Sequence, residues 1–222
     1  MRAERRFGAV LFDLLTALLD SWTLWDDIAG SEDNGRKWRA AYLRRTYKTG
    51  AYRPYEALVA EAATEVGLLP ILGAQLAARY GELKPWPEVG EVLDALRREG
   101  VALGVVTNCS EKLAAKAVAC TGIDFDVVVT AERAGYYKPD PRPYKMALDE
   151  LDVTPGRCLF VAGYHRASPL AIPAPRLPSA AHHPERQCNS PSPFPLTPIP
   201  GGWCGAPRSS GSAAPGSTTR KC

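Results

Sequence analysis

The most constraining feature of this sequence is a short apolar run, Ala9–Phe12, that ends at an acidic residue, Asp13. Such a run is typical of a strand buried in a parallel sheet. Apolar runs recur along the first 163 residues and alternate with helix-like segments. This alternation predicts an α/β fold with a doubly wound, Rossmann-like parallel sheet. The further strands are expected at Val101–Val106, Phe125–Val129 and Cys158–Val161, and the helices between them at Glu88–Glu99, Glu111–Cys120 and Arg142–Leu151.

The stretch between the first two predicted strands, residues 20–84, contains no strong strand pattern. Its helix-like segments are Gly35–Tyr47, Tyr55–Val66 and Leu72–Leu83. Because the stretch is too long for a simple crossover, we expect an inserted helical cap. The core would then be discontinuous, with residues 1–19 and 85–163 on either side of the cap in the sequence.

The composition changes sharply after Gly163. Residues 164–222 hold 12 of the 20 prolines, six Lys or Arg, and a single acid, Glu185, so their net charge is +5. The first 163 residues carry a net charge of −2, and the overall +3 therefore comes from this tail. Its Pro, Ser and Gly content, without helical or strand periodicity, predicts a disordered segment.

Polar groups follow the predicted strands at three places. The carboxyl ends of parallel strands form the ligand site of such sheets, so Asp13 and the pair Thr107-Asn108 are candidate site residues. A carboxylate there can act as a covalent nucleophile, and a hydroxyl with an amide can hold an anion. Lys138, at the start of a Pro-rich turn, offers an ammonium that keeps a carboxylate ionised. Taken singly, each group also fits an ordinary structural role, as a cap or a surface lysine.

Together and in this order, these elements resemble the haloacid dehalogenase (HAD) superfamily of hydrolases. The resemblance covers about residues 7–163, and its most specific piece is the Lys-Pro-Asp-Pro run that starts at Lys138. It implies a HAD-like Rossmannoid sheet with a helical cap inserted after the first strand. It also implies that Asp13 is the nucleophile, with Thr107 in the second motif and Lys138 in the third.

Leu15 bears on the branch of the superfamily. HAD phosphatases usually have a second Asp two residues after the nucleophile; it acts as a general acid, and its backbone carbonyl helps to hold Mg²⁺. Leucine cannot protonate a leaving alkoxide. The pattern Phe12-Asp13 followed by Leu18-Leu19-Asp20 instead resembles the 2-haloacid dehalogenases, which release halide without a proton and need no Mg²⁺.

Residues further along the chain extend this resemblance. Trp38-Arg39 resembles a Trp-Arg pair of the dehalogenase cap, and Gly50-Ala51-Tyr52 resembles the sequence that follows it. Tyr144 matches an active-site tyrosine of the same enzymes. The catalytic residues implied by the resemblance are Asp13, Lys138 and Arg39, and the implied substrate-binding residues are Thr107, Asn108, Tyr144, Trp38 and Leu15.

The resemblance also implies a mechanism. Asp13 would displace halide from a small 2-halo carboxylic acid, and water would then hydrolyse the resulting ester. Arg39 would receive the halide, and Thr107 with Asn108 would orient the substrate carboxylate. Trp38 and nearby aromatic side chains would keep the pocket dry.

Two departures from the dehalogenase pattern leave alternatives open. Ala17 stands where the dehalogenases have Thr, which implies the loss of a hydroxyl near the nucleophile. The family also places an Asp just after the fourth strand, to position the hydrolytic water, whereas no Asp follows Asp152 here. A HAD-type phosphatase acting on a small phosphate ester and a non-catalytic HAD-fold protein are therefore the alternatives. Because resemblance and composition both break near Gly163, we hypothesise that the tail arises from another reading frame, from splicing or from an error in the gene sequence.

Cofactor and partner expectations follow from the same residues. We expect no cofactor, with Mg²⁺ needed only for the phosphatase alternative, and a small-molecule carboxylate as the substrate. The basic excess lies in a tail without interleaved aromatic residues, which argues against nucleic-acid binding. The apolar run Ala9–Leu19 is too short for a membrane span and lacks the flanks of an export signal. The six cysteines show no C-x-x-C spacing, so we expect a soluble cytoplasmic protein, with a homodimer as a candidate assembly.

Overall fold

A computed structural model of the chain describes residues 7–163. These residues belong to one of the two units into which the chain divides, Met1–Leu177. The predicted disordered tail, residues 164–222, lies outside the described residues.

Four parallel strands form the central sheet, in the order β5-β4-β1-β6. They are β1 (Ala9–Phe12), β4 (Ala102–Thr107), β5 (Val127–Thr130) and β6 (Cys158–Val161). Strand β1 lies between β4 and β6, and Phe12 is in register with Val105 on one side and Val161 on the other. The sheet confirms the predicted α/β fold, and its register brings Asp13 to the carboxyl edge of the sheet.

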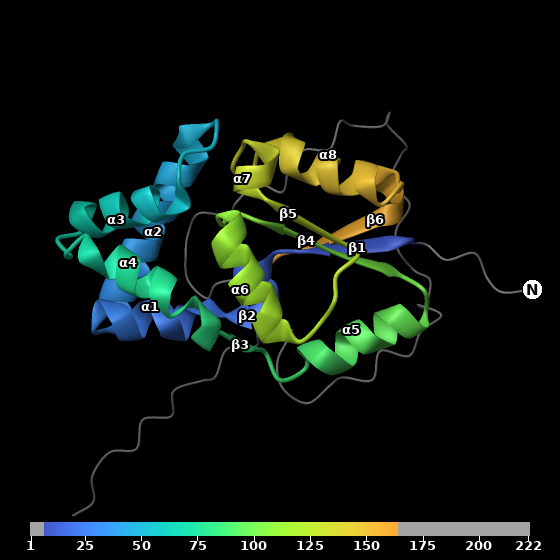
Figure 1. Cartoon of the computed structure of the whole chain (residues 1–222), viewed down its shortest axis with the longest axis horizontal. Helices are drawn as coiled ribbons and strands as arrows, with labels where there is room; N and C mark the ends of the chain where they lie inside the picture. The colour runs from blue at the N-terminus through green and yellow to red at the C-terminus, as the bar shows by residue number, and fades with distance from the viewer. Residues whose placement is uncertain (1–6, 164–222) are drawn as a thin grey trace, which may run out of the picture. The chain divides into compact units, whose positions relative to one another are not determined.

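Helices cover both faces of this sheet. Figure 1 shows α5 (Val89–Arg98) and α6 (Glu111–Thr121) on one face, and α7 (Ala131–Ala134) and α8 (Pro141–Glu150) on the other. Successive strand residues alternate between the two faces. Accordingly, Leu11 packs in a small cluster with Ala147 of α8, whereas Val10 belongs to the larger core that includes Leu93 of α5. The sheet is therefore doubly wound, as the sequence predicts.

The helical cap is inserted after β1. The chain leaves the core through β2 (Leu19–Asp20) and returns through β3 (Lys84–Pro85), and the two strands pair antiparallel. Between them lie four helices and a 3₁₀ turn, namely α1 (Ser21–Ala29), α2 (Glu32–Thr49), α3 (Tyr55–Glu65), α4 (Ile71–Ala78) and Tyr80–Glu82. The sequence missed α1, and the single helix expected at Leu72–Leu83 is wrong, because α4 ends at Ala78. Among residues 7–163, no helix is long and apolar enough to cross a membrane.

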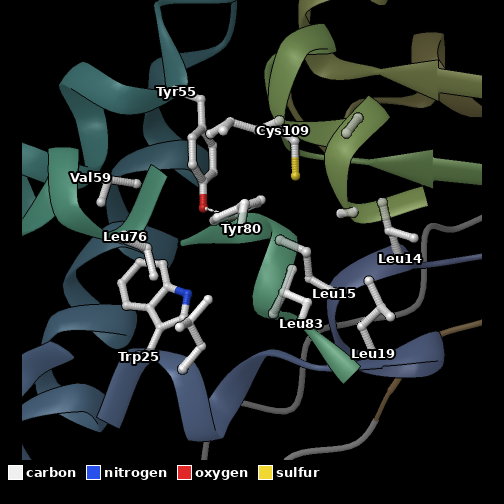
Figure 2. Close-up of a cluster of buried hydrophobic side chains, with 14 of the residues drawn as sticks. Leu14, Leu15, Leu19, Trp25, Tyr55, Val59, Leu76, Tyr80, Leu83 and Cys109 are labelled. Atoms are coloured by element: carbon white, nitrogen blue, oxygen red, sulfur yellow. Dashed lines mark hydrogen bonds between the residues drawn. The ribbon is translucent and has the colours of Figure 1, made fainter. Parts of the chain in front are cut away.

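Aromatic side chains fill the inside of the cap. The ring centroids of Trp25 and Trp38 lie 4.6 Å apart. Those of Tyr42 and Tyr55 lie 5.2 Å apart in a T-shaped arrangement. Figure 2 shows the hydroxyls of Tyr55 and Tyr80 hydrogen-bonded within the same buried cluster as Leu15. Each aromatic pair stabilises the packing by about 0.5–1.5 kcal/mol beyond the burial of its area. The apolar core therefore runs continuously from the cap to the turn that follows Asp13.

Candidate active site

Asp13 is fixed at the end of β1 by its own backbone and side chain. Its N–H donates to the carbonyl oxygen of Val161 at 2.9 Å, which ties it to β6. A single π-helical turn, Leu14–Leu18, follows, and Asp13 caps this turn by accepting from the N–H of Thr16 at 3.1 Å. Such π turns occur frequently at functional sites. The turn holds the carboxylate at the carboxyl edge of the sheet.

Thr16 also supplies a hydroxyl to the carboxylate. Its Oγ1 donates to Oδ2 of Asp13. The resemblance implied that one hydroxyl is lost at Ala17, and the structure shows that the neighbouring Thr16 supplies a hydroxyl to the same carboxylate. The π turn places the third residue after Asp13 beside its carboxylate.

Lys138 is the cation that faces this carboxylate. Its Nζ donates to Oδ1 of Asp13 at 2.7 Å and to the carbonyl oxygen of Val106 at 2.6 Å. The exposed fractions of the two side chains are only 11% for Lys138 and 17% for Asp13. Burial opposes ionisation of Asp13, but the charge and hydrogen bond of Lys138, the hydrogen bond from Thr16 and the charge of Arg39 together lower the pKa of Asp13. The carboxylate is therefore held in the ionised form that a nucleophile requires.

Asn108 holds the backbone of Lys138. Its Oδ1 accepts from the N–H of Lys138 at 2.7 Å, and its Nδ2 donates to the carbonyl oxygen of Lys138 at 3.2 Å. Its own carbonyl oxygen accepts from the hydroxyl of Tyr42 on α2 at 3.2 Å. Both ends of the Asn108 amide are thus engaged with Lys138, which gives the side chain a positioning role. Its predicted contact with the substrate carboxylate stays a prediction.

The segment that follows α2 docks on the loop that carries Lys138. The N–H of Tyr52 donates to the carbonyl oxygen of Gly135 at 2.7 Å, and Ala51 pairs with Tyr136 in an isolated bridge. The Tyr137 hydroxyl donates to the carbonyl oxygen of Arg53 at 2.7 Å. The Gly50-Ala51-Tyr52 run singled out in the sequence therefore joins the cap to the Lys138 loop.

Arg39 is a second buried cation, contributed by the cap. It is 6% exposed, and its Nη1 donates to Oγ of Ser21 at 2.6 Å. The Trp22 ring lies against the guanidinium, with its centroid 3.9 Å from Cζ. Burial lowers the pKa of Arg39, although the charge of Asp13 is among the effects that raise it. Within residues 7–163, Arg39 forms no ion pair with a carboxylate, so its charge remains able to attract an anion.

The remaining predicted site residues lie at different depths. Thr107 ends β4, is fully buried, and its hydroxyl shares a hydrogen bond with the Cys109 thiol at 3.3 Å. Trp38 is enclosed in the cap, where its indole N–H donates to the carbonyl oxygen of Val59 at 2.8 Å. Burial, and then the charge of Asp13, raise the pKa of Tyr144, so this hydroxyl lies within the electrostatic field of the Asp13 carboxylate.

Directly after β6, the chain crosses the π-helical turn Leu14–Leu18 that follows Asp13, which we call the nucleophile turn after the role proposed below for Asp13. A Cβ added to Gly163 would lie 2.3 Å from the carbonyl carbon and oxygen of Thr16. That separation is shorter than any real contact, so only glycine allows the backbone to pass at this position. The end of β6 is therefore packed against the same turn that orients Asp13.

The donor set near Asp13 does not suit a metal ion. Across the part of the chain that the structure describes, no group of three or more His, Cys, Asp or Glu residues could hold one. Mg²⁺ prefers oxygen ligands, usually with carboxylates among them. The side chain of Leu15 is apolar, and its carbonyl oxygen already accepts a hydrogen bond from the Ser21 hydroxyl. Among the described residues, neither a carboxylate cluster nor the side chain of Leu15 supplies the oxygen ligands that Mg²⁺ prefers.

Comparison with known proteins agrees with this geometry. A family model described as haloacid dehalogenase-like hydrolase matches residues 9–162. The chain belongs to this family. The HAD-like hydrolase is 29% identical to (S)-2-haloacid dehalogenase 1 of Pseudomonas sp. (strain CBS-3) over 170 residues, which cover 69% of this chain and 75% of the relative.

Shorter matches come from a dehalogenase and from a pyrophosphatase. (S)-2-haloacid dehalogenase 4A of Burkholderia cepacia is 31% identical over 90 residues, which span 40% of this chain but only 39% of that protein. Pyrophosphatase PpaX of Bacillus velezensis is 38% identical over 80 residues, which span 35% of this chain and 37% of that protein. The relatives of this chain therefore include a phosphatase as well as dehalogenases.

Solved structures show the same fold. A dehalogenase crystal structure with an intermediate complex superimposes with a TM-score of 0.63 at 26% identity and covers 72% of this chain and 78% of that one. The resemblance to the 2-haloacid dehalogenase-like branch, first inferred from sequence motifs, is confirmed by these relatives and by the fold.

Three residues of this HAD-like site were missed in the sequence. They are Thr16 and the neighbours of Arg39, namely Ser21 and Trp22. The Asp-x-x-Thr spacing is a capping signal that points to Thr16. No local pattern pairs Ser21 with Arg39, because the two residues lie 18 positions apart and meet only through the packing of α1 against α2.

Proposed function

We propose that this HAD-like hydrolase is a 2-haloacid dehalogenase acting on a small 2-halo carboxylic acid. The observation that carries the proposal is the Asp13 carboxylate, whose pKa is lowered by its contact with Lys138 and which lies beside the apolar Leu15. An oxygen of Asp13 attacks the carbon that bears the halogen. The carbon–halogen bond breaks, its electron pair leaves with the halide, and an ester joins Asp13 to the substrate carbon.

Two positively charged groups favour this first step. Lys138 keeps Asp13 deprotonated, so no separate base is needed to activate it. Arg39 attracts the leaving halide, which departs with a full negative charge and needs no proton. In this proposal the substrate binds between the core, residues 1–19 and 85–163, and the cap, residues 20–84. Thr107 and Tyr144 line the core side.

Water completes the proposed cycle by adding to the ester carbonyl carbon of Asp13. The oxygen that becomes negative in the tetrahedral intermediate lies within reach of Lys138 if it is Oδ1, and of the Thr16 donors if it is Oδ2. Collapse of the intermediate restores the Asp13 carboxylate and releases a 2-hydroxy acid with one proton. The proposed net reaction consumes one water and yields one halide ion.

The proposed reaction needs no metal ion. A phosphatase would need a proton donor for its leaving alkoxide, and Leu15 occupies the position two residues after Asp13 where the resemblance places that donor. We therefore expect halide release to be insensitive to chelators, and phosphate esters to be poor substrates.

One assay tests the proposal directly. The protein is incubated with 2-chloropropionate and, separately, with p-nitrophenyl phosphate, each with Mg²⁺ or with EDTA. We expect chloride release that EDTA does not affect and that Asp13→Asn lowers by at least about a thousandfold. Mass spectrometry of the Asp13 peptide after rapid quenching should show the ester. Phosphate release that depends on Mg²⁺, or the absence of both products from folded protein, would contradict the proposal.

A further inference from the structure

Ser21 stands between the buried cation of the cap and the turn that carries the nucleophile. It is the first residue of α1 and is only 1% exposed. Its hydroxyl donates to the carbonyl oxygen of Leu15, and its oxygen accepts from Nη1 of Arg39. A hydroxyl has one proton, so donation to Leu15 leaves only lone pairs for Arg39. The Leu15 carbonyl oxygen therefore fixes the direction of the Ser21 hydroxyl proton, and a lone pair on the same oxygen is left to accept from Arg39.

Arg39 retains donors that no protein group fills. A guanidinium has five N–H groups in one plane, and across residues 7–163 Ser21 is the single hydrogen-bond acceptor that Arg39 meets. The Trp22 ring covers one face of the plane, and the Trp25 ring lies 5.6 Å from Cζ. Aromatic rings attract the cation, but they carry no net charge and so do not neutralise it. The other N–H groups of the guanidinium lie in its plane and have no acceptor among the described residues, so they are the donors that a small anion would use.

We propose that Ser21 is a positioning residue that orients Arg39 toward a halide-sized anion next to the nucleophile turn. The identity of the anion rests on the proposed dehalogenase function, whereas the link from Leu15 through Ser21 to Arg39 does not. Leu15 lies two residues after Asp13 in the core, whereas Ser21 and Arg39 belong to the cap. The two hydrogen bonds therefore fix the position of the guanidinium relative to Asp13 across the boundary between cap and core. Without the hydrogen bond from Ser21 to Leu15, this chain of contacts would hold Arg39 within the cap alone and not relative to Asp13.

Loss of the Ser21 hydroxyl should affect the chemical step more than substrate binding. The halide acquires its full charge only as the carbon–halogen bond breaks, so a misplaced Arg39 weakens the transition state more than it weakens substrate capture. Hydrogen bonds to charged groups are among the stronger ones, and we expect Ser21→Ala to lower kcat by about tenfold. The KM for 2-chloropropionate should change by less than about twofold.

The matched control is Thr23→Ala on the same helix. The Thr23 hydroxyl is exposed and donates only to Oδ2 of Asp20 at 2.6 Å, away from Arg39. This variant should keep both kinetic constants of the wild type. Circular dichroism and urea unfolding verify that each variant is folded. If Ser21→Ala does not fold, Ser21→Cys keeps the side-chain volume while weakening both hydrogen bonds.

Bromide binding provides a readout that needs no turnover. The saturable part of tryptophan fluorescence quenching by bromide is measured at constant ionic strength, balanced with gluconate. We expect Arg39→Met to abolish it, Ser21→Ala to raise the bromide Kd by about tenfold, and Thr23→Ala to leave it unchanged. Bromide binding without any halide release would overturn the proposed function but not the role of Ser21. An unchanged bromide Kd in Ser21→Ala, or no saturable binding by the wild type, would overturn the role of Ser21.

Discussion

Two buried cations flank the nucleophile turn, and their surroundings differ. Lys138, from the core, contacts a carboxylate and a carbonyl oxygen. Arg39, from the cap, contacts one hydroxyl and the faces of two indole rings. The charge of Lys138 is therefore balanced by a carboxylate of the protein, whereas Arg39 contacts no carboxylate among residues 7–163. In our proposal the first cation keeps the nucleophile ionised, and the second receives the leaving group.

The largest expected effect is the loss of stability in Lys138→Met. This variant leaves the Asp13 carboxylate buried without its cation, which costs about 3–5 kcal/mol for a buried pair broken on one side. Urea unfolding at pH 7 measures the difference from the wild type. The matched control is Lys145→Met on the exposed face of α8, which should unfold within about 0.5 kcal/mol of the wild type. A similar result for the two variants would show that Lys138 does not balance Asp13.

The same comparison should depend on pH. The folded-state pKa of Asp13 is lowered from 3.8 in the wild type, so the stability it contributes is present above pH 3.8 and lost as the pH falls through the folded-state pKa. In Lys138→Met, burial acts unopposed by Lys138 and disfavours the ionised form. We expect the gap in unfolding free energy between the two proteins to shrink as the pH falls from 7 toward 3. A gap that stays constant would mean that the loss comes from packing rather than from charge.

Asn108→Ala should have an intermediate effect. The variant removes two hydrogen bonds to the Lys138 backbone, which together contribute about 1–3 kcal/mol. Asn108→Asp keeps the acceptor for the Lys138 N–H but loses the donor to its carbonyl oxygen, so it isolates one of the two bonds. Urea unfolding combined with chloride-release kinetics measures both consequences. Full wild-type stability in Asn108→Ala would remove its role in holding Lys138.

The smallest stability effect is expected for Arg39→Met. Methionine fills a similar apolar volume, and the substitution leaves no carboxylate unpaired, so unfolding free energy should change by less than about 1 kcal/mol. Halide release should nevertheless fall by at least about a hundredfold, because the leaving group loses its cation. A destabilisation as large as that of Lys138→Met would erase the distinction between the two cations.

Much of the core could be predicted from local patterns. Apolar runs located all four strands to within two residues, and α6 ends at Thr121, one residue after the end predicted for its helix, with Gly122 as its left-handed cap at a φ of +67°. The strand ends also placed Asp13 correctly at the carboxyl edge of the sheet. These features depend on periodicity and on single residues with special backbone geometry, and both can be seen without tertiary information.

Contacts between distant segments could not be predicted in this way. The engagement of the Asn108 amide with Lys138 joins residues 30 positions apart, and the burial of Trp38 inside the cap depends on Val59 and Trp25. The start of α1 was missed because Asp20 follows an apolar run without a break, although its carboxylate caps the helix at Thr23. Such arrangements arise from packing between helices, which a one-dimensional pattern does not specify.

The composition of the chain changes after Gly163, and this is the residue whose backbone passes close to Thr16 in the nucleophile turn. Any other residue at position 163 would push on the turn whose N–H and hydroxyl hold the Asp13 carboxylate. The glycine at this junction therefore cannot be exchanged freely. A chain joined at this point would therefore preserve the geometry of its nucleophile only if the join left that one residue intact.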